Sequence, residues 1–308
     1  MKVIYATGSL KQSLKNTCVA IGIFDGMHRG HQYLIKHMID CARRLGARPT
    51  VITFFPHPAH VLRPDISLPY LASLSKRLEL FKSLGVERCV IIRFNKSFAR
   101  IDPQRFIKET LVQQMDVKAV FVGDDFRFGK DRAGDIALFK RLGIGFGFTM
   151  HPMKSLKQGG EPISSTRIRR CIADGKLPQA RLLLGRDFSV EGRVVNGAGR
   201  GKGLGFPTAN IKIDSDVMPP LGVYAVRMRL GSKLCSGVAN IGLRPSFKEK
   251  NPQVHLEVHL FNFKRDIYNK TVEVIFLKKI REERRFPNPQ ALIAQITRDI
   301  KAAHKIIS

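Results

Sequence analysis

The stretch GIFDGMHRGHQYLI (residues 22–35) decides the fold of the first half of the chain. It follows the apolar run VAIGIF (19–24) and leads into apolar residues at helical spacing, namely Leu34, Ile35, Met38, Ile39, Ala42 and Leu45. A continuous apolar run typically forms a strand that is buried on both faces, and the spaced residues predict a helix packed on it. Three further runs of this kind follow, TVITFF (50–55), CVIIRF (89–94) and AVFVG (119–123). The sequence therefore predicts a doubly wound, Rossmann-like α/β domain with a ligand site at the carboxyl ends of its parallel strands.

The turn between this first strand and its helix has the composition of an anion site. The free amides and the positive dipole end of a helix N-terminus bind phosphate, and Gly30 lets the backbone approach it. His28 and His31 can both turn toward such a site and donate hydrogen bonds to a phosphate chain or to a departing pyrophosphate. Two histidines near a turn are more often structural, but the preceding strand, the following helix and Gly26 in the turn favour phosphate binding.

A second candidate for phosphate binding is ISSTRIRR (163–170). Hydroxyl groups at a helix start, followed by Arg167, can hold the far end of a triphosphate. The simpler interpretation is that Ser-Ser-Thr only caps a helix.

The hydrophobic pattern of the sequence changes after about residue 185. Valine-rich alternating runs separated by Gly and Pro turns predict five or six antiparallel strands of a small barrel or sandwich; they are FSVEGRVV, GVYAVRMRL, CSGVANIG, VHLEVHLF and KTVEVIFL. Asn288 and Pro289 then form a cap and first-turn pair, and apolar residues at three- and four-residue steps predict a closing amphipathic helix. We place the domain boundary near Gly185, which divides the chain into 1–184 and 185–308.

The segment GAGRGKGLGFPTANI (197–211) is glycine-rich and basic. Its backbone amides can wrap phosphates, with contacts expected from Gly201, Lys202 and Gly203, although a flexible glycine loop before an ordinary strand is an equal alternative. Thr208 and Asn210 are two residues apart, so on an extended chain they project to the same face. A hydroxyl and an amide carbonyl are oxygen ligands suited to Mg²⁺.

The strand VHLEVHLF (254–261) places His255, Glu257 and His259 on one face and leucine and valine on the other. Two histidines and a glutamate suggest a metal site, but a solvated strand face is the simpler interpretation.

The motifs of the first half resemble those of prokaryotic bifunctional FAD synthetases. GxFDGxHxGH (22–31), FFPHP (54–58), VGDDFRFG (122–129) and ISSTRIR (163–169) follow each other in that family's order. The resemblance implies a nucleotidyltransferase domain in which the phosphate of FMN attacks the α-phosphorus of ATP and pyrophosphate departs. It implies that His28 and His31 stabilise the transition state.

The same resemblance assigns the other residues of the first half. Those expected to bind ATP are Gly22, Phe24, Asp25, Gly30, Ser165, Thr166 and Arg167, and those expected near the flavin are His57, Asp125, Phe126 and Phe128. For His57, which lies between two prolines, a rigid loop is the alternative.

The second half resembles the riboflavin kinase domain of the same family, through GRDFSVEGRVV, GFPTAN, GVYAV, GVANIG and EVHLFNF. The resemblance implies a six-stranded barrel in which Thr208 and Asn210 bind Mg²⁺ and ATP. It also implies that Glu257 takes the proton from the terminal hydroxyl of riboflavin. Leu243 and Ser246 depart from this pattern, because the family commonly has threonines there.

Composition sets the broad class. A chain of 308 residues exceeds one usual hydrophobic core, so two domains are expected. The net charge of +28 is spread over both halves, +17 for residues 1–184 and +11 for the rest, which favours anionic ligands such as nucleotides without implying a dedicated nucleic-acid partner. Five scattered cysteines without a CxxC pair, and the lack of a long apolar run, indicate a cytoplasmic protein with no membrane partner. A homo-oligomer is possible.

Two alternatives remain at this point. One is an HxGH adenylyltransferase for another phosphate substrate, such as phosphopantetheine, with an unrelated β domain. The other is a nucleic-acid-binding protein that uses a basic barrel, but such a barrel needs exposed aromatics for base stacking. Trp is absent, and the aromatic residues of the second half lie mostly in apolar strand contexts.

Overall fold

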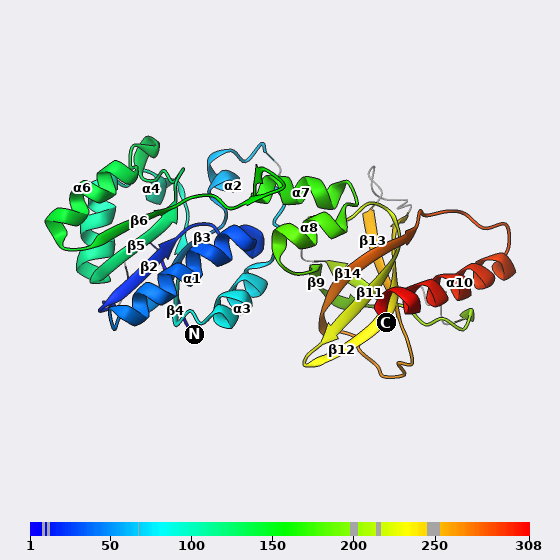
Figure 1. Ribbon diagram of the computed structural model, residues 1–308. Helices are drawn as coiled ribbons and strands as arrows, with labels where there is room; N and C mark the ends of the chain where they lie inside the picture. Colours follow the sequence, from blue (N-terminus) through cyan, green and yellow to red (C-terminus); the bar gives the residue numbers. More distant parts are fainter. Residues whose placement is uncertain (8–9, 11–12, 67, 198–202, 214–216, 245–252) are drawn as a thin grey trace. The chain divides into compact units, whose positions relative to one another are not determined.

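The computed structural model describes the chain except for residues 8–9, 11–12, 67, 198–202, 214–216 and 245–252 (Figure 1). Two compact units are present. The first comprises Met1–Leu68 and Leu74–Ile163, and the second comprises Pro69–Ser73 and Ser164–Ser308. Among the described residues, no helix is both long enough and apolar enough to cross a bilayer.

The first unit is built on a sheet of six parallel strands in the order β1-β4-β3-β2-β5-β6. The strands are β1 (Lys2–Ala6), β2 (Thr17–Ile21), β3 (Arg48–Phe55), β4 (Arg88–Arg93), β5 (Val117–Gly123) and β6 (Thr149–Met153). The helical segments are η1 (Asp25–Met27), α1 (Arg29–Arg44), α2 (Pro58–Leu62), α3 (Leu74–Leu84), α4 (Lys96–Ala99), α5 (Pro103–Arg105), η2 (Phe106–Gln114), η3 (Lys130–Arg132) and α6 (Ile136–Phe146), and a small hairpin pairs β7 (Lys157–Gln158) with β8 (Glu161–Pro162).

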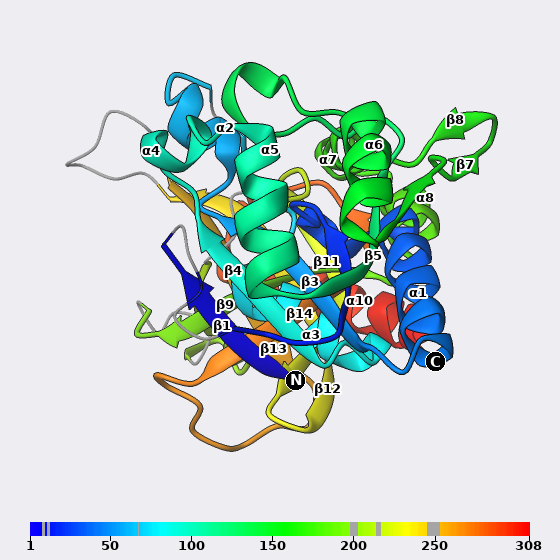
Figure 2. The ribbon, with the colours of Figure 1, turned by 90° about the vertical axis from the view of Figure 1, so that its left-hand side faces the viewer.

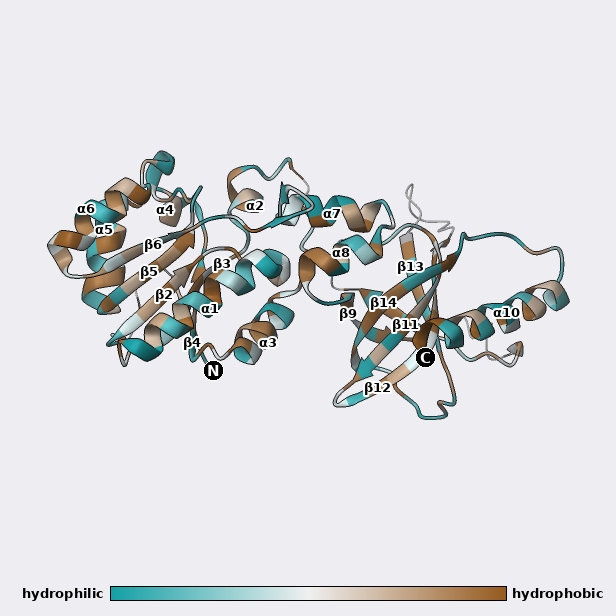
Figure 3. Ribbon diagram, in the orientation of Figure 1, coloured by the Kyte–Doolittle hydropathy of each residue, from teal (hydrophilic) through white to brown (hydrophobic). Residues whose placement is uncertain are grey.

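Helices cover both faces of this sheet. Val19 and Ile21 of β2 join an apolar cluster with η2 and α6, whereas Cys18 and Ala20 join a second cluster with α1 and α3. Figure 2 shows the α5–η2 segment and α6 in front of the strands, and Figure 3 shows the apolar character of the strands themselves. This burial on both faces explains why the central strands are continuous apolar runs.

The chain reverses direction across the sheet at β2. From β2 it proceeds to β3 and β4 on one side, and it later places β5 and β6 on the other side. Ligands of doubly wound sheets bind at the carboxyl ends of the strands at such a switch point. The turn that contains His28 follows β2 directly and therefore lies at this position.

The second unit contains a closed antiparallel barrel with the strand order β10-β13-β12-β11-β14-β9. Its strands are β9 (Phe188–Val195), β10 (Ala209–Ile213), β11 (Gly222–Leu230), β12 (Lys233–Arg244), β13 (Gln253–Leu260) and β14 (Thr271–Arg281), and its helices are α7 (Ser165–Ala173), α8 (Leu177–Leu184) and α10 (Pro289–Ile307). Leu256, Val258 and Leu260 of β13 are buried, and the residues between them are partly exposed. This alternation fills the barrel with one face of each strand.

The predicted fold class is confirmed in both halves. The closing helix begins as expected, because the side chain of Asn288 accepts a hydrogen bond from the amide of Ala291 at 2.8 Å. The sequence did not reveal β1 and β6, whose burial is incomplete because they are the edge strands of the sheet.

The compact units divide the chain before Gly185. Helix α8 contacts β9 and β14, and α7 contacts α8, so both helices belong to the second unit. That unit also includes the short segment Pro69–Ser73, where the hydroxyl of Ser73 donates to Glu191 and Nε of Arg169 donates to the carbonyl of Pro69 at 2.7 Å. Gly185 as the functional boundary remains a prediction.

Candidate active sites

The first candidate site is the turn between β2 and α1, which has an unusual backbone. Phe24 (φ 54°), Gly26 (φ 73°) and Met27 (φ 43°) all lie in the left-handed region. For residues other than glycine such conformations cost about 1–3 kcal/mol each and persist only where the surroundings impose them. Met27 is fully buried and Phe24 is 2% exposed, so the core holds both side chains in place.

A buried arginine supports this turn from α3. The carbonyl of Ile23 accepts hydrogen bonds from Nη1 of Arg77 at 2.9 Å and from the hydroxyl of Thr53 at 3.0 Å. The side chain of Arg77 is fully buried, and the amide of Gly22 donates to Ile52 at 3.1 Å. The start of the turn is thus fixed to one strand, β3, and one helix, α3.

His28 caps helix α1. Its Nδ1 accepts a hydrogen bond from the amide of His31 at 3.3 Å, which assigns the proton of the neutral ring to Nε2. A Cβ atom at Gly30 would lie 3.2 Å from two ring atoms of His28, which is a tight contact, so glycine avoids crowding this ring. The cap therefore fixes the tautomer as well as the orientation of His28.

His31 stacks on His28, with the ring centroids 3.5 Å apart, and meets the edge of Phe24 at 5.3 Å. Burial lowers the pKa of His31 well below its usual value, and the neighbouring His28 and Arg77 lower it further. Its Nδ1 is buried without a hydrogen-bond partner in the described part of the chain. At neutral pH this ring is uncharged and can act as a hydrogen-bonding group.

The lowered pKa of His31 predicts a pH-dependent stability. The unfolded chain takes up a proton at His31 below about pH 6.5 whereas the folded chain does not, so stability falls as the pH falls through that value. Between pH 7 and pH 5.5 the unaltered protein should lose about 1 kcal/mol more than His31→Gln. Urea unfolding followed by circular dichroism at each pH measures this difference, and parallel pH profiles of the two proteins would refute it.

His57 and Asp125 follow the strands on either side of β2, because β3 precedes His57 and β5 precedes Asp125. Both therefore lie at the same edge of the sheet as the His28 turn. Nδ1 of His57 accepts from the amide of Ala59 at 3.0 Å and caps α2, which gives this histidine a structural contact. Asp125 is exposed at the end of β5.

The rings of Phe126 and Phe128 are less exposed to a ligand than the side chain of Asp125. Their rings stack on each other at 5.6 Å, and Phe128 lies 4.6 Å from the ring of buried Phe139. Both are partly buried against the core of the first unit.

The ring of Phe24 and the side chain of Asp25 are buried too, so Phe24 offers a ligand its backbone only.

Ser165, Thr166 and Arg167 form the first turn of α7. Ser164 is the cap residue, and its hydroxyl accepts from the amide of Arg167 at 3.2 Å. These residues belong to the second unit and the paired histidines to the first, so their grouping around one nucleotide remains a prediction.

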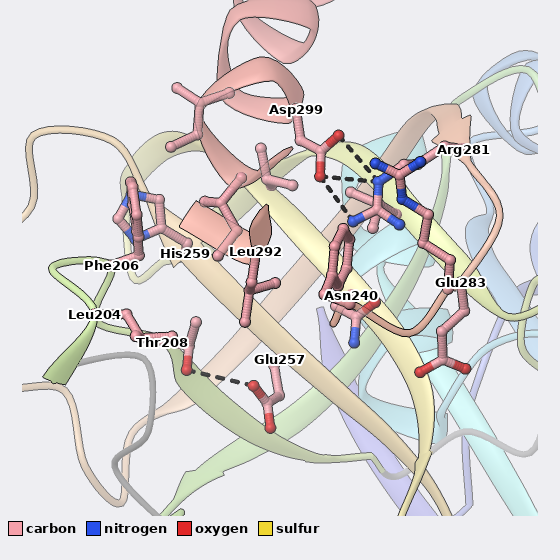
Figure 4. Close-up of a pocket in the computed structure, with 16 residues that line it drawn as sticks. Leu204, Phe206, Thr208, Asn240, Glu257, His259, Arg281, Glu283, Leu292 and Asp299 are labelled. Carbon is pink, nitrogen blue, oxygen red and sulfur yellow. Dashed lines mark hydrogen bonds and ion pairs between the residues drawn. The ribbon is translucent and has the colours of Figure 1, made fainter. Parts of the chain in front are cut away.

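The second candidate site is a pocket of about 290 Å³ on the outer wall of the barrel, beside α10 (Figure 4). Thr208 and Glu257 contribute polar groups to it, with the Thr208 hydroxyl 3.5 Å from Oε2 of Glu257. Apolar and aromatic side chains form much of the remaining lining: Leu204, Phe206, Val223, Val238, Phe286, Leu292, Ile296 and Ile300. This composition suits a largely apolar ligand that carries polar groups.

Strand register places Glu257 between two amides. On one side Asn210 of β10 lies directly opposite Glu257, and on the other side Asn240 of β12 does. Asn240 lines the pocket, and sequence reasoning missed it. The only signal was a polar residue at an outward position of the apolar strand GVANIG, whose importance depends on its strand partner.

The face of β13 that we expected to be solvated is partly exposed at Glu257 and His259. Both are partly buried and line the pocket. His259 contacts the carbonyl of Pro207 through Nδ1 at 2.9 Å and meets the ring of Phe206 edge-on at 5.7 Å. It therefore belongs to the aromatic wall.

The glycine-rich segment borders Asn210. A Cβ atom at Gly197 would lie 2.0 Å from Nδ2 of Asn210, so only glycine allows this close approach. A Cβ atom at Gly203 would meet no other atom within 4 Å. Gly201, Lys202 and Ser246 lie outside the described residues. Leu243 is 45% exposed near the end of β12.

The donor set near Glu257 fits Mg²⁺. Thr208, Asn210 and Glu257 offer a hydroxyl, an amide carbonyl and a carboxylate, which are the oxygen ligands that this ion prefers. Among the residues that the structure describes, no group of three or more His, Cys, Asp or Glu is placed to hold a metal.

A buried ion pair holds α10 over the pocket. Arg281 at the end of β14 binds Asp299 of α10 through Nε and Nη2, at 2.9 to 3.1 Å. Gln295 donates to Asp299 at 2.7 Å and accepts from Arg284. No local pattern predicts this network, because Arg281 and Asp299 lie 18 residues apart and meet only when the helix packs on the barrel.

Asp299→Asn should therefore weaken both the fold and the pocket. Asp299 is almost fully buried, but Arg281 keeps 19% side-chain exposure, so we expect a loss of about 2 kcal/mol, less than for a fully buried pair. Urea unfolding measures this loss. Asp174→Asn, which alters the exposed pair with Lys176, is the matched control and should change stability by less than about 1 kcal/mol. Equal effects of the two substitutions would contradict the prediction.

Comparisons with known proteins match both halves. The family model for FAD synthetase matches residues 10–167, and the model for riboflavin kinase matches residues 184–307. The second match disfavours an unrelated β domain.

Curated relatives match nearly the whole chain. The bifunctional riboflavin kinase/FMN adenylyltransferase of Escherichia coli K12 is 40% identical, over 97% of this chain and 96% of its own. The protein of the same description from Buchnera aphidicola subsp. Schizaphis graminum is 37% identical, over 99% and 98%. A crystal structure described as a macrolide-efflux protein from Streptococcus pneumoniae is 30% identical, with a TM-score of 0.88 and 99% of each chain covered.

Proposed function

The chain belongs to the bifunctional riboflavin kinase/FMN adenylyltransferase family, and on that premise we propose that its two halves divide the reactions between them. The enzyme uses ATP to convert riboflavin to FMN and then FMN to FAD. We assign the first reaction to the barrel pocket and the second to the turn after β2, with the boundary near Gly185.

In the kinase reaction, Glu257 acts as the base. Its carboxylate takes the proton from the terminal hydroxyl of riboflavin as the oxygen attacks the γ-phosphorus of ATP, and ADP leaves. The observation that supports this role most is the position of Glu257 between two amides in an otherwise largely apolar pocket. Thr208 and Asn210 would hold Mg²⁺, which supplies positive charge for the phosphates when bound.

The flavin ring occupies the apolar part of the pocket in this proposal. Phe206, Phe286, Leu292 and Ile296 line this part of the pocket, and their apolar surfaces can pack against an aromatic ring. Gly201, Lys202 and Gly203 would contact the phosphates of ATP beside Asn210. Displacement of α10 should then raise the KM for riboflavin more than the KM for ATP.

In the adenylylation reaction, His28 and His31 stabilise the charge that develops on the phosphates of ATP. Nε2 of His28 is a donor because its other nitrogen is engaged as the cap, and neutral His31 lies stacked beside it. FMN attacks through a phosphate oxygen, the new bond forms to the α-phosphorus, and pyrophosphate leaves. No covalent enzyme intermediate is required.

Other predicted contacts complete this site. The backbone around Gly22, Phe24, Asp25 and Gly30 would border the nucleotide, and Ser165, Thr166 and Arg167 would bind its phosphates. His57, Asp125, Phe126 and Phe128 would approach the flavin from the ends of β3 and β5.

One incubation tests the assignment of both activities. Purified protein with riboflavin, ATP and Mg²⁺ should yield FMN and then FAD, which chromatography separates. Omission of Mg²⁺ should stop the kinase step. Absence of FMN from the complete mixture would overturn the kinase assignment, and FMN without FAD would overturn the adenylylation assignment.

We place the enzyme in the cytoplasm. All five cysteines are free and buried, and burial raises the pKa of Cys18 and of Cys89 to about 12, so these thiols are poor nucleophiles. Unpaired thiols suit a reducing compartment.

A further inference from the structure

Asn240 lines the pocket from β12, the strand that pairs with the strand of Glu257. Residues that lie directly opposite each other in an antiparallel pair share a face of the sheet. The registers Asn210↔Glu257 and Asn240↔Glu257 therefore place the three side chains in one row across β10, β13 and β12. Neighbouring strands are about 4.8 Å apart, so each amide lies within one side chain's reach of the carboxylate.

The two ends of this row have different surroundings. Asn210 adjoins Gly197 of the glycine-rich segment, where we place ATP. Asn240 lines the apolar pocket together with Val238 on the same strand. The row thus connects a phosphate side with a flavin side, and Glu257 lies between them.

A second polar group accompanies Asn240 on the flavin side. A Cβ atom at Gly242 would lie 2.5 Å from Oε1 of Glu283 and 3.2 Å from Nδ2 of Asn240. The absence of a side chain at Gly242 therefore lets the Glu283 carboxylate and the Asn240 amide both approach the same part of β12. Both residues line the pocket.

This arrangement matches the chemistry of the chain that links the flavin ring to the reacting hydroxyl. In the proposed kinase reaction the terminal hydroxyl lies at Glu257 and the ring lies in the apolar part of the pocket. The intervening hydroxyls must then pass Asn240. An amide side chain both donates and accepts hydrogen bonds, as successive hydroxyls of a polyol require.

We propose that Asn240, assisted by Glu283, binds the secondary hydroxyls of the ribityl chain and makes the kinase selective for polyhydroxylated flavins. The inference rests on the proposed kinase function of this pocket. A site built to hydrogen-bond a substrate rejects an analogue without the partner groups, because its own polar atoms are then left unpaired.

The test compares two flavins that share one ring. One is riboflavin, and the other carries a pentyl chain with a single terminal hydroxyl. The unaltered protein should phosphorylate riboflavin with a kcat/KM at least about tenfold higher. Asn240→Ala should lower kcat/KM for riboflavin by about tenfold and change the value for the pentyl analogue by less than about twofold, so that the selectivity collapses.

Two further variants control for indirect effects. Val238→Ala removes apolar contact from the same face of β12. It should lower kcat/KM for the two flavins by the same factor, so the ratio of the two values should not change. Asn240→Ser introduces a hydroxyl that can donate and accept hydrogen bonds, so this variant should retain part of the selectivity that Asn240→Ala loses. Thermal unfolding verifies that each variant is folded.

The outcomes separate this inference from the function on which it rests. If Asn240→Ala lowers kcat/KM equally for the two flavins, the selectivity is unchanged. That result would overturn the role of Asn240, while the kinase assignment would stand. Failure of the unaltered protein to phosphorylate either flavin would overturn the kinase assignment itself.

Discussion

Glu257→Gln should abolish the conversion of riboflavin to FMN and leave the conversion of supplied FMN to FAD intact. Glutamine keeps the size of the side chain and one acceptor oxygen, but it replaces the other oxygen with an NH2 donor and cannot take the proton of the attacking hydroxyl. General-base catalysis contributes roughly 10²–10⁴-fold, so the rate of FMN formation should fall by about that factor. Chromatography of flavins after incubation with riboflavin and ATP, and separately with FMN and ATP, measures both steps on one protein.

His255→Gln is the matched control for this substitution. His255 lies two residues before Glu257 on the same face of β13 but does not line the pocket, so FMN formation should remain near its original rate. A Glu257→Gln protein that still forms FMN at more than about a tenth of the original rate would exclude the carboxylate as the base.

The double substitution His28→Ala with His31→Ala should produce the opposite defect. FMN should accumulate from riboflavin and FAD should not form, because the donors that stabilise the departing pyrophosphate are gone. Loss of one preorganised donor typically costs about 10²–10³ in kcat, so the pair should lower FAD formation by at least about 10³-fold. Removal of the His28 cap also costs about 1 kcal/mol of stability, which unfolding curves reveal separately.

His37→Ala provides the control on the same helix. This histidine is exposed on α1 and its ring contacts the neighbouring Tyr33, so FAD formation should be unaffected. Equal loss of both reactions in the double variant would contradict the assignment of separate sites.

The fold was largely predictable because burial leaves a clear pattern in the sequence. Central strands such as β2 are apolar throughout because helices cover both faces, and the barrel strands alternate because only one face is interior. The observed β9 and β11 coincide with the predicted runs FSVEGRVV and GVYAVRMRL. The edge strands β1 and β6 lack this pattern, since neighbours cover them on one side only.

The candidate sites were predictable where a motif is local and not where tertiary structure creates it. His28 and His31 lie three residues apart, and Thr208 directly precedes β10, which contains Asn210, so their spacing alone groups each pair. Asn240 acquires its position from strand register, and the Arg281–Asp299 pair arises from the packing of a helix on the barrel. Buried Arg77 reaches the turn from 54 residues away, which no local pattern encodes.

The excursion of Pro69–Ser73 into the second unit has a consequence for protein dissection. Residues 69–73 belong to that unit, the chain then returns to the first unit, and it enters the second unit again at Ser164. A protein truncated between the two regions that the family models match therefore lacks part of the second unit. A fragment that starts at residue 164 or 184 lacks the hydroxyl that binds Glu191, and the longer fragment also lacks the carbonyl that Arg169 binds. Supplying residues 69–73 on a short linker would restore these contacts to an isolated barrel.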